Sequence, residues 1–113
     1  MPTSVRTGCD LVSIPRFRQQ VGEGGSAFLE RIFLPGELPG KTLERLAGMF
    51  AAKEAVCKAL NRPAGCWLGI CIEHDPSGAP RAVLLEPDPG AFELSISIAH
   101  DGEYALAFAV AWT

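Results

Sequence analysis

The sequence of 113 residues lacks most of the features that mark membrane proteins, secreted proteins and nucleic-acid-binding proteins. None of its apolar runs approaches the roughly 20 residues of a membrane-spanning helix, so we expect no membrane partner. Residues 1–6 lack the basic and then apolar layout of a secretory signal, which favours a cytoplasmic protein. Ten Lys and Arg against thirteen Asp and Glu give a net charge of −3, which argues against a nucleic-acid partner.

Cysteine and histidine are also scarce. The four cysteines, Cys9, Cys57, Cys66 and Cys71, form no C-x-x-C pair, and the chain has only two histidines. Each cysteine lies among apolar neighbours in the sequence, as is usual for small thiols buried in proteins of a reducing compartment. We therefore predict free thiols rather than a zinc site or a disulfide framework.

Residues 1–113 are expected to form a single domain, because a chain of 12.0 kDa has no room for two. Hydrophobic residues make up 48% of the chain and charged residues 20%, a balance typical of globular domains rather than of disordered chains. The apolar pattern changes from that of a strand to that of helices and then back to that of strands. This order predicts an α+β fold in which a long helix packs on a small antiparallel sheet.

Glycine, proline and apolar spacing predict the individual elements. The strongest helix covers residues 41–60 and is ended by Pro63. Before it, we expect a buried strand over residues 5–12, a helix that begins at Ser13 and stops before Gly22, a second short helix from Ser26, and an irregular segment over residues 34–40. After it, we expect strands over residues 68–74 and 80–85 around a turn at 75–78, a loop over 86–90, and a final hairpin.

The final hairpin bears on the oligomeric state. Asp101-Gly102 is typical of a type I′ turn, and with these two residues as the loop Ile98 opposes Ala105. Neither face of this hairpin carries charge along its length. Because the long helix can cover only one face, the other needs a cover, and a second copy of the chain is the simplest one. The hairpin therefore predicts a homo-oligomer.

Polar side chains in unusual places are the candidates for chemistry. Asp10 lies inside an otherwise apolar strand, where an unpaired carboxylate is costly. Glu54 and Lys58 are four residues apart on the long helix and so project from one side, while His100 ends a strand directly before the turn. Carboxylates such as Asp10 and Glu54 suit Mg²⁺ bound to phosphate, and a lysine can hold a neighbouring phosphate. Together they predict metal-assisted cleavage of a diphosphate ester.

Each of these residues also has a purely structural interpretation, which the residues alone favour. Glu54 and Lys58 can form an ordinary ion pair on the helix surface. Asp10 can cap the helix that follows, and His100 can be a turn residue hydrogen-bonded to the backbone. A plain nucleotide-binding domain is disfavoured, because the sequence has no G-x-x-x-x-G-K-[ST] loop.

Three segments resemble a known family in the same order along the chain. Residues 8–17, GCDLVSIPRF, resemble the opening of the bacterial holo-acyl-carrier-protein synthase family. Residues 46–60, LAGMFAAKEAVCKAL, closely resemble its F-A-A-K-E-A-x-x-K-A signature. Residues 94–101, LSISIAHD, resemble its S-x-S-H-D segment. The resemblance covers nearly the whole chain and implies the 4′-phosphopantetheinyl transferase fold.

The resemblance also implies an activity and a site. The family transfers 4′-phosphopantetheine from coenzyme A to a serine of an apo acyl carrier protein, which leaves adenosine 3′,5′-bisphosphate. Asp10 and Glu54 match its Mg²⁺ carboxylates, and Glu54 also matches the group that helps remove the serine proton, directly or through a water. Lys58 matches the lysine beside the diphosphate, and His100 matches a histidine at the edge of the coenzyme A site. The family is typically homotrimeric, with its sites between subunits.

The same resemblance assigns the contact with the carrier protein. Arg16, with Arg18 on the same helix, matches the basic helix that meets the acidic carrier. A solvated surface charge is the structural interpretation of Arg18.

The chain departs from the family pattern at three places. Met49 replaces a basic residue, Ala99 replaces a hydroxyl residue beside His100, and residues 61–65 replace a Gly-Thr-Gly-like loop. Arg62 can compensate in that loop as a coenzyme A contact. The departures concern coenzyme and carrier binding more than the metal carboxylates. They leave an alternative, in which the chain is a catalytically weak relative that acts as a binding or assembly module of a synthase system.

Overall fold

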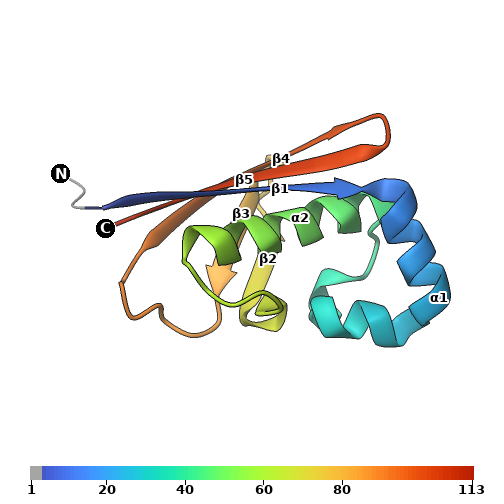
Figure 1. Cartoon of the computed structure of the whole chain (residues 1–113), viewed down its shortest axis with the longest axis horizontal. Helices are drawn as coiled ribbons and strands as arrows, with labels where there is room; N and C mark the ends of the chain where they lie inside the picture. The colour runs from blue at the N-terminus through green and yellow to red at the C-terminus, as the bar shows by residue number, and fades with distance from the viewer. Residues whose placement is uncertain (1–3) are drawn as a thin grey trace.

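A three-stranded antiparallel sheet lies on one long helix. The structure is a computed structural model that describes residues 4–113 (Figure 1). Within these residues the sheet has the order β1-β5-β4, and its strands are β1 (Val5–Ser13), β5 (Tyr104–Trp112) and β4 (Glu93–Asp101). Helix α2 (Leu43–Ala59) runs along one face of this sheet. This arrangement confirms the predicted α+β fold of a long helix on a small antiparallel sheet.

The remaining elements pack around α2. Helix α1 (Ile14–Ile32) follows β1 directly and lies at one end of the molecule (Figure 1). A second antiparallel sheet pairs β2 (Ile70–His74) with β3 (Pro80–Leu84). Two short 3₁₀ segments, Pro35–Glu37 and Trp67–Gly69, lie in the connections before and after α2. No helix among residues 4–113 is long and apolar enough to cross a membrane.

Small residues allow α2 to approach the sheet closely. The alanines of β5 that face the helix are at most 1% exposed, and they are Ala105, Ala107, Ala109 and Ala111. On β1 the contact is closer still: a Cβ atom added at Gly8 would lie 1.9 Å from the backbone oxygen of Ala55. Gly8 is therefore the point at which β1 touches the helix. Since alternate residues of a strand share a face, the side chain of Asp10 also projects on the helix side.

Three predicted elements differ in detail. Strand β1 is buried on its helix side only, with Gly8 and Val12 buried but Leu11 60% exposed, so the prediction of a fully buried strand was wrong. The expected break in the first helix occurs as a kink at Gly25, whose φ of 59° favours glycine. The segment over residues 34–40, expected to be irregular, contains the 3₁₀ turn Pro35–Glu37, since proline fits the first position of a helical turn.

The register of the last hairpin was predicted incorrectly. Its loop is Gly102-Glu103 rather than Asp101-Gly102, so Asp101 opposes Tyr104 and Ile98 opposes Ala107. Gly102 has a φ of 57°, whereas Asp101 and Glu103 do not take positive φ. One positive φ at the first central residue is the feature of a type II′ turn, in contrast to the two of type I′. The shift is of two residues, so every side chain stays on its predicted face.

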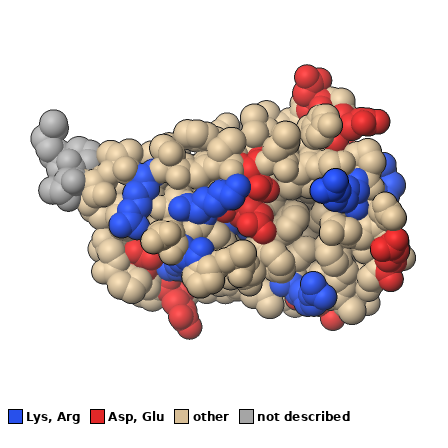
Figure 2. Space-filling model, viewed as in Figure 1, with Lys and Arg blue, Asp and Glu red and all other residues tan. Residues whose placement is uncertain are grey.

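The outer face of the main sheet is apolar and uncovered, as predicted. Tyr104, Leu106 and Phe108 of β5 are 51%, 41% and 44% exposed, and Leu11 lies opposite Leu106 on the same face. Charged side chains on the face seen in Figure 2, by contrast, are of both signs and interspersed, with no large area of one sign.

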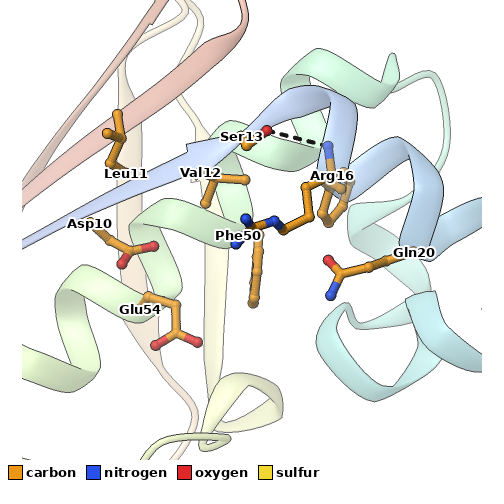
Figure 3. A pocket seen from close by; sticks show the side chains of 9 residues that line it. Asp10, Leu11, Val12, Ser13, Arg16, Gln20, Phe50 and Glu54 are labelled. Atoms are coloured by element: carbon orange, nitrogen blue, oxygen red, sulfur yellow. Dashed lines mark hydrogen bonds between the residues drawn. The ribbon is translucent and has the colours of Figure 1, made fainter.

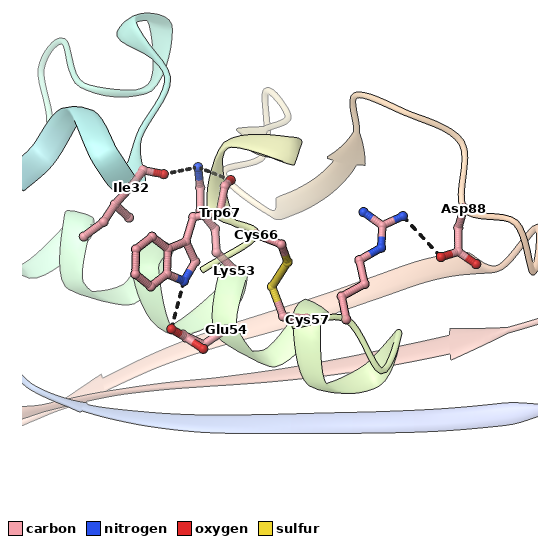
Figure 4. Close-up of a disulfide and its surroundings, with 8 residues drawn as sticks. Ile32, Lys53, Glu54, Cys57, Cys66, Trp67 and Asp88 are labelled. Atoms are coloured by element: carbon pink, nitrogen blue, oxygen red, sulfur yellow. Dashed lines mark hydrogen bonds and ion pairs between the residues drawn. A yellow bond between two sulfur atoms is a disulfide. The ribbon is translucent and has the colours of Figure 1, made fainter. Parts of the chain in front are cut away.

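The prediction of four free thiols was wrong for two cysteines. Cys57 and Cys66 form a disulfide, whereas Cys9 and Cys71 are free (Figure 4). The chain turns back after Pro63, which brings Cys66 against the last turns of α2, and a sequence pattern of apolar neighbours carries no information about this return. The disulfide fastens the segment that contains Trp67 to the helix that contains Glu54.

Candidate active site

Asp10 and Glu54 line one open cavity of about 340 Å³. Asp10 comes from β1 and Glu54 from α2, and Figure 3 shows both carboxylates directed toward the same side. Arg16 and Gln20 reach this cavity from α1, and Phe50 lies at its base. Two acidic side chains that are distant in the sequence therefore line the same cavity.

Local structure explains why Asp10 is available to this cavity. It does not cap the following helix, because Ser13 takes that role and accepts a hydrogen bond from the Arg16 backbone N–H at 3.3 Å. Asp10 is instead held by Lys58, whose Nζ lies 3.2 Å from Oδ1 of Asp10 and 2.9 Å from the backbone oxygen of Cys9. Lys58 thus bonds to β1 rather than forming a surface pair with Glu54.

Glu54 has a different kind of partner. The indole N–H of Trp67 donates a hydrogen bond to Oε1 of Glu54 at 2.8 Å (Figure 4). A neutral donor orients a carboxylate without cancelling its charge. Sequence reasoning did not find Trp67, because an isolated tryptophan before a predicted strand looks like a core residue.

The donor set fits a Mg²⁺ ion that shares its coordination with phosphate. Within residues 4–113 no cluster of three or more His, Cys, Asp and Glu side chains could hold a metal alone. Mg²⁺ characteristically takes only one or two carboxylates and completes its octahedron with substrate phosphate oxygens and water. The carboxylates of Asp10 and Glu54 match that requirement, and Lys58 and Arg16 supply positive charge beside them.

His100 lies in a second cavity, of about 290 Å³. Its Nε2 is 2.8 Å from the backbone oxygen of Glu44, at the opposite end of α2 from Lys58. The ten residues from Glu44 to Glu54 span about 15 Å of helix, so within one chain His100 does not join the first cavity. Met49, one of the departures from the family pattern, also lines this second cavity and is buried, whereas Ala99 is exposed on the outer face of the sheet.

The second cavity is rich in basic groups. Arg45 and His74 line it together with His100, and Lys41 lies in an adjoining cavity with Arg45 and His74. Burial lowers the pKa of His74, and the positive charges of Arg45 and Lys41 lower it further. Arg45 and Lys41 therefore supply the positive charge at this end of α2, where Glu37 and Glu73 also line the adjoining cavity.

The other predicted contacts lie outside both cavities. Arg18 forms an ion pair with Glu44 at 2.9 Å, and both side chains are about half exposed. Arg62 forms an ion pair with Asp88 at 3.2 Å, on a separate cavity that also includes Cys66. The structure thus brings Asp10, Glu54 and Lys58 together with Arg16, and it places Arg18, Arg62 and His100 elsewhere.

Comparison with known proteins gives a consistent result. Residues 6–109 match the model of the 4′-phosphopantetheinyl transferase superfamily. The holo-[acyl-carrier-protein] synthase of Renibacterium salmoninarum is 37% identical over 110 residues, covering 92% of this chain and 94% of that protein. The synthase of Trichlorobacter lovleyi is 39% identical over 114 residues, covering 88% and 90%. The crystal structure of the Helicobacter pylori synthase with coenzyme A superposes with a TM-score of 0.84 at 36% identity, covering 93% of this chain and 98% of that one.

Proposed function

Since this chain belongs to the 4′-phosphopantetheinyl transferase superfamily, we propose that it is a holo-acyl-carrier-protein synthase. It transfers 4′-phosphopantetheine from coenzyme A to a serine of an apo acyl carrier protein. The observation that carries this proposal is that Asp10 and Glu54 line one open cavity, while Lys58 bonds to Asp10 at 3.2 Å. All three residues match the family's own motifs, which supports a shared role at the diphosphate.

In the proposed reaction the serine oxygen bonds to the phosphorus atom that carries the pantetheine arm. The bond from this phosphorus to the bridging oxygen breaks, and adenosine 3′,5′-bisphosphate leaves. Glu54 is placed to accept the hydroxyl proton, directly or through a water, because the carboxylate opens to the cavity. Lys58, whose side chain is 54% exposed, can turn from Asp10 toward the diphosphate and stabilise the charge that develops there.

A further part of the proposal is that Asp10 and Glu54 hold a Mg²⁺ ion. Such an ion would neutralise charge on the diphosphate and polarise the phosphorus that is attacked. The support is the chemistry of the donors: two hard carboxylates on one cavity, with lysine and arginine groups beside them.

We also propose a homotrimer whose sites lie between subunits. His100 is about 15 Å along α2 from Glu54, so a histidine from a neighbouring copy explains how both could serve one coenzyme A molecule. The uncovered apolar face of the main sheet supplies the surface for such an assembly. Its three largest exposed side chains on β5, Tyr104, Leu106 and Phe108, are a continuous apolar strip along one strand.

The carrier protein is proposed to approach over α1. Arg16 lines the cavity, and Arg18 is exposed two residues further along α1, where it pairs with Glu44. Positive charge there suits an acidic partner. Arg62 is proposed as a coenzyme A contact, which it can provide once released from Asp88. We propose that the protein acts in fatty acid biosynthesis in the cytoplasm. The acyl carrier protein of that pathway would provide the serine that is modified.

The test is transfer itself. The chain is incubated with coenzyme A, Mg²⁺ and several apo carrier proteins, and the mass of each carrier is measured. We expect one carrier to gain a single phosphopantetheine group, and Glu54→Gln to abolish this gain because it removes charge but keeps shape. Glu30→Gln, at an exposed position late in α1, is the matched control and retains activity. A normal rate for Glu54→Gln would remove Glu54 from the mechanism. Failure of the unsubstituted chain with every carrier would favour the alternative of a binding or assembly module.

A further inference from the structure

The starting observation is that the two carboxylates of the cavity are held in different ways. Asp10 is paired with the charged ammonium group of Lys58. Within residues 4–113 the carboxylate of Glu54 has one hydrogen-bond partner, the neutral indole N–H of Trp67 at 2.8 Å. That bond engages Oε1 and leaves Oε2 without a hydrogen bond, in a side chain that lines the cavity.

Trp67 is itself fastened to α2 along one stripe of the helix. Its ring packs edge-on against Phe50, with ring centroids 5.5 Å apart, and its backbone oxygen accepts a hydrogen bond from Lys53 at 3.2 Å. The preceding residue, Cys66, is disulfide-bonded to Cys57 (Figure 4). Residues 50, 53, 54 and 57 follow the spacing at which side chains lie above one another on a helix. Trp67 thus contacts Phe50, Lys53 and Glu54, and its neighbour Cys66 fixes the segment one turn further along the helix.

Lys53 makes this attachment rigid. Its side chain is fully buried and bonds to Glu37 at 2.6 Å and to the backbone oxygen of Ile32 at 2.8 Å, as well as to Trp67. Glu37 also accepts a hydrogen bond from the Ile72 backbone N–H at 2.8 Å. A buried charge with all its donors engaged tolerates little movement, so the backbone of Trp67 is held in one place.

We propose that Trp67 is a positioning residue, whose indole N–H holds one oxygen of Glu54 and thereby aims the other into the cavity shared with Asp10. This inference rests on the proposed function, because it assigns a purpose to the orientation of Glu54. A free glutamate side chain samples several rotamers and loses that freedom when it binds a cation or accepts a proton. Fixing the rotamer in advance removes this loss. Outer contacts of this kind typically change metal affinity or activity by about 10- to 100-fold.

The substitution that isolates the contact is Trp67→Phe. It retains an aromatic ring against Phe50 and removes the indole N–H. The chain has two tryptophans, so Trp112→Phe at the end of β5 is a matched control with the same chemical change. Unfolding midpoints of both variants establish that each is folded. A second variant, Trp67→His, retains a ring N–H donor and should restore part of the effect.

The first readout is independent of activity and of any cation. In an N–H correlation spectrum the two indole groups give separate cross-peaks, and the Trp67 peak is the one that disappears in Trp67→Phe. We expect Glu54→Gln to move the Trp67 peak and to leave the Trp112 peak in place. This outcome establishes the contact even if the chain proves to have no transferase activity. An unmoved Trp67 peak overturns the inference.

The second readout is direct binding of Mn²⁺, used in place of Mg²⁺ and followed by the loss of the free-ion signal in electron paramagnetic resonance with coenzyme A present. We expect Trp67→Phe to weaken Mn²⁺ binding about 10- to 100-fold and Trp112→Phe to leave it unchanged. Equal Mn²⁺ affinity in folded Trp67→Phe and in the control overturns the inference. If the unsubstituted chain binds no Mn²⁺, the proposed metal site fails, and the cross-peak test still decides whether Trp67 orients Glu54.

Discussion

The ammonium group of Lys58 lies 3.2 Å from the carboxylate of Asp10, although the two are 48 positions apart in the sequence. This contact joins the end of α2 to the middle of β1 at the edge of the cavity. A lysine held in this way is already close to the place where a diphosphate would bind, and its partner is a residue of the same site. Lys58 therefore bonds to a residue that lines the cavity, which supports the role proposed for it.

Lys58→Ala should reduce phosphopantetheine transfer by about 100- to 1,000-fold, the usual effect of removing one charge that stabilises a transition state. We expect most of the loss in kcat, since the charge matters most as the phosphorus–oxygen bond breaks. Arg81→Ala, at an exposed position on β3, is the control for loss of a positive charge. Steady-state kinetics with coenzyme A as the varied substrate compare the Lys58→Ala and Arg81→Ala variants. An unchanged kcat in Lys58→Ala contradicts the assigned role.

Gly8→Ala should destabilise the protein by about 1–3 kcal/mol or more, as overpacking a tight contact does. The added Cβ would lie 1.9 Å from the backbone oxygen of Ala55. A backbone atom, unlike the end of a flexible side chain, cannot relieve this clash by changing rotamer. Because β1 would be pushed from α2, activity should fall as well. Gly22→Ala is the contrast: nothing lies within 4 Å of its added Cβ in an exposed part of α1, and stability should rise by up to about 1 kcal/mol. Urea unfolding of both variants measures the difference.

His74 should make the protein less stable as the pH falls. Burial and the charges of Arg45 and Lys41 lower the pKa of His74 below its ordinary value of 6.5 in the folded state. The unfolded chain therefore takes up the proton first, so stability decreases as the pH falls through the unfolded pKa and the loss is complete below the folded one. Replacing His74 by Gln should reduce this dependence as the pH falls through the ordinary value of 6.5 and below it. Parallel stability curves for the two proteins would rule out the contribution of His74.

Phe108→Glu should dissociate the proposed homotrimer, because it puts a charge into the uncovered apolar face of the sheet. Sedimentation velocity should give about three times the 12.0 kDa chain mass for the unsubstituted protein and the chain mass for the variant. Ala79→Glu, in the exposed turn before β3, adds the same charge elsewhere and should remain assembled. Transfer activity should fall with dissociation if His100 acts in a neighbour's site; a fully active monomer would show that each chain has a complete site.

The sequence predicted the fold because it depends on repeated local patterns, whereas the pairing of Asp10 with Glu54 in one site came from the resemblance to the family motifs. Apolar spacing identifies α2, and a carboxylate inside an apolar strand is visible without any structure. The hairpin register was missed because it depends on which residue of Asp101-Gly102-Glu103 takes a positive φ, and Gly102 can serve in either turn type.

The remaining differences have one physical cause. The disulfide between Cys57 and Cys66 and the bond from Trp67 to Glu54 both arise where the chain turns back on α2 after Pro63. The path of such a return is set by tertiary packing, including the buried Lys53, and not by the composition of the turn. The position of His100 at the far end of α2 likewise follows from how β4 lies along the helix, which no motif specifies.

The pairing of Val5 with Trp112 has a practical meaning for anyone who handles this protein. Strand β1 begins and strand β5 ends at the same end of the molecule, whereas α1, with Arg16, occupies the opposite end (Figure 1). A purification tag or surface tether attached at either terminus would therefore lie away from α1, over which the carrier protein is proposed to approach. Because the start of β1 and the end of β5 lie close together, the chain is also suitable for circular permutation. The new termini would be placed in the exposed turn at residues 76–79.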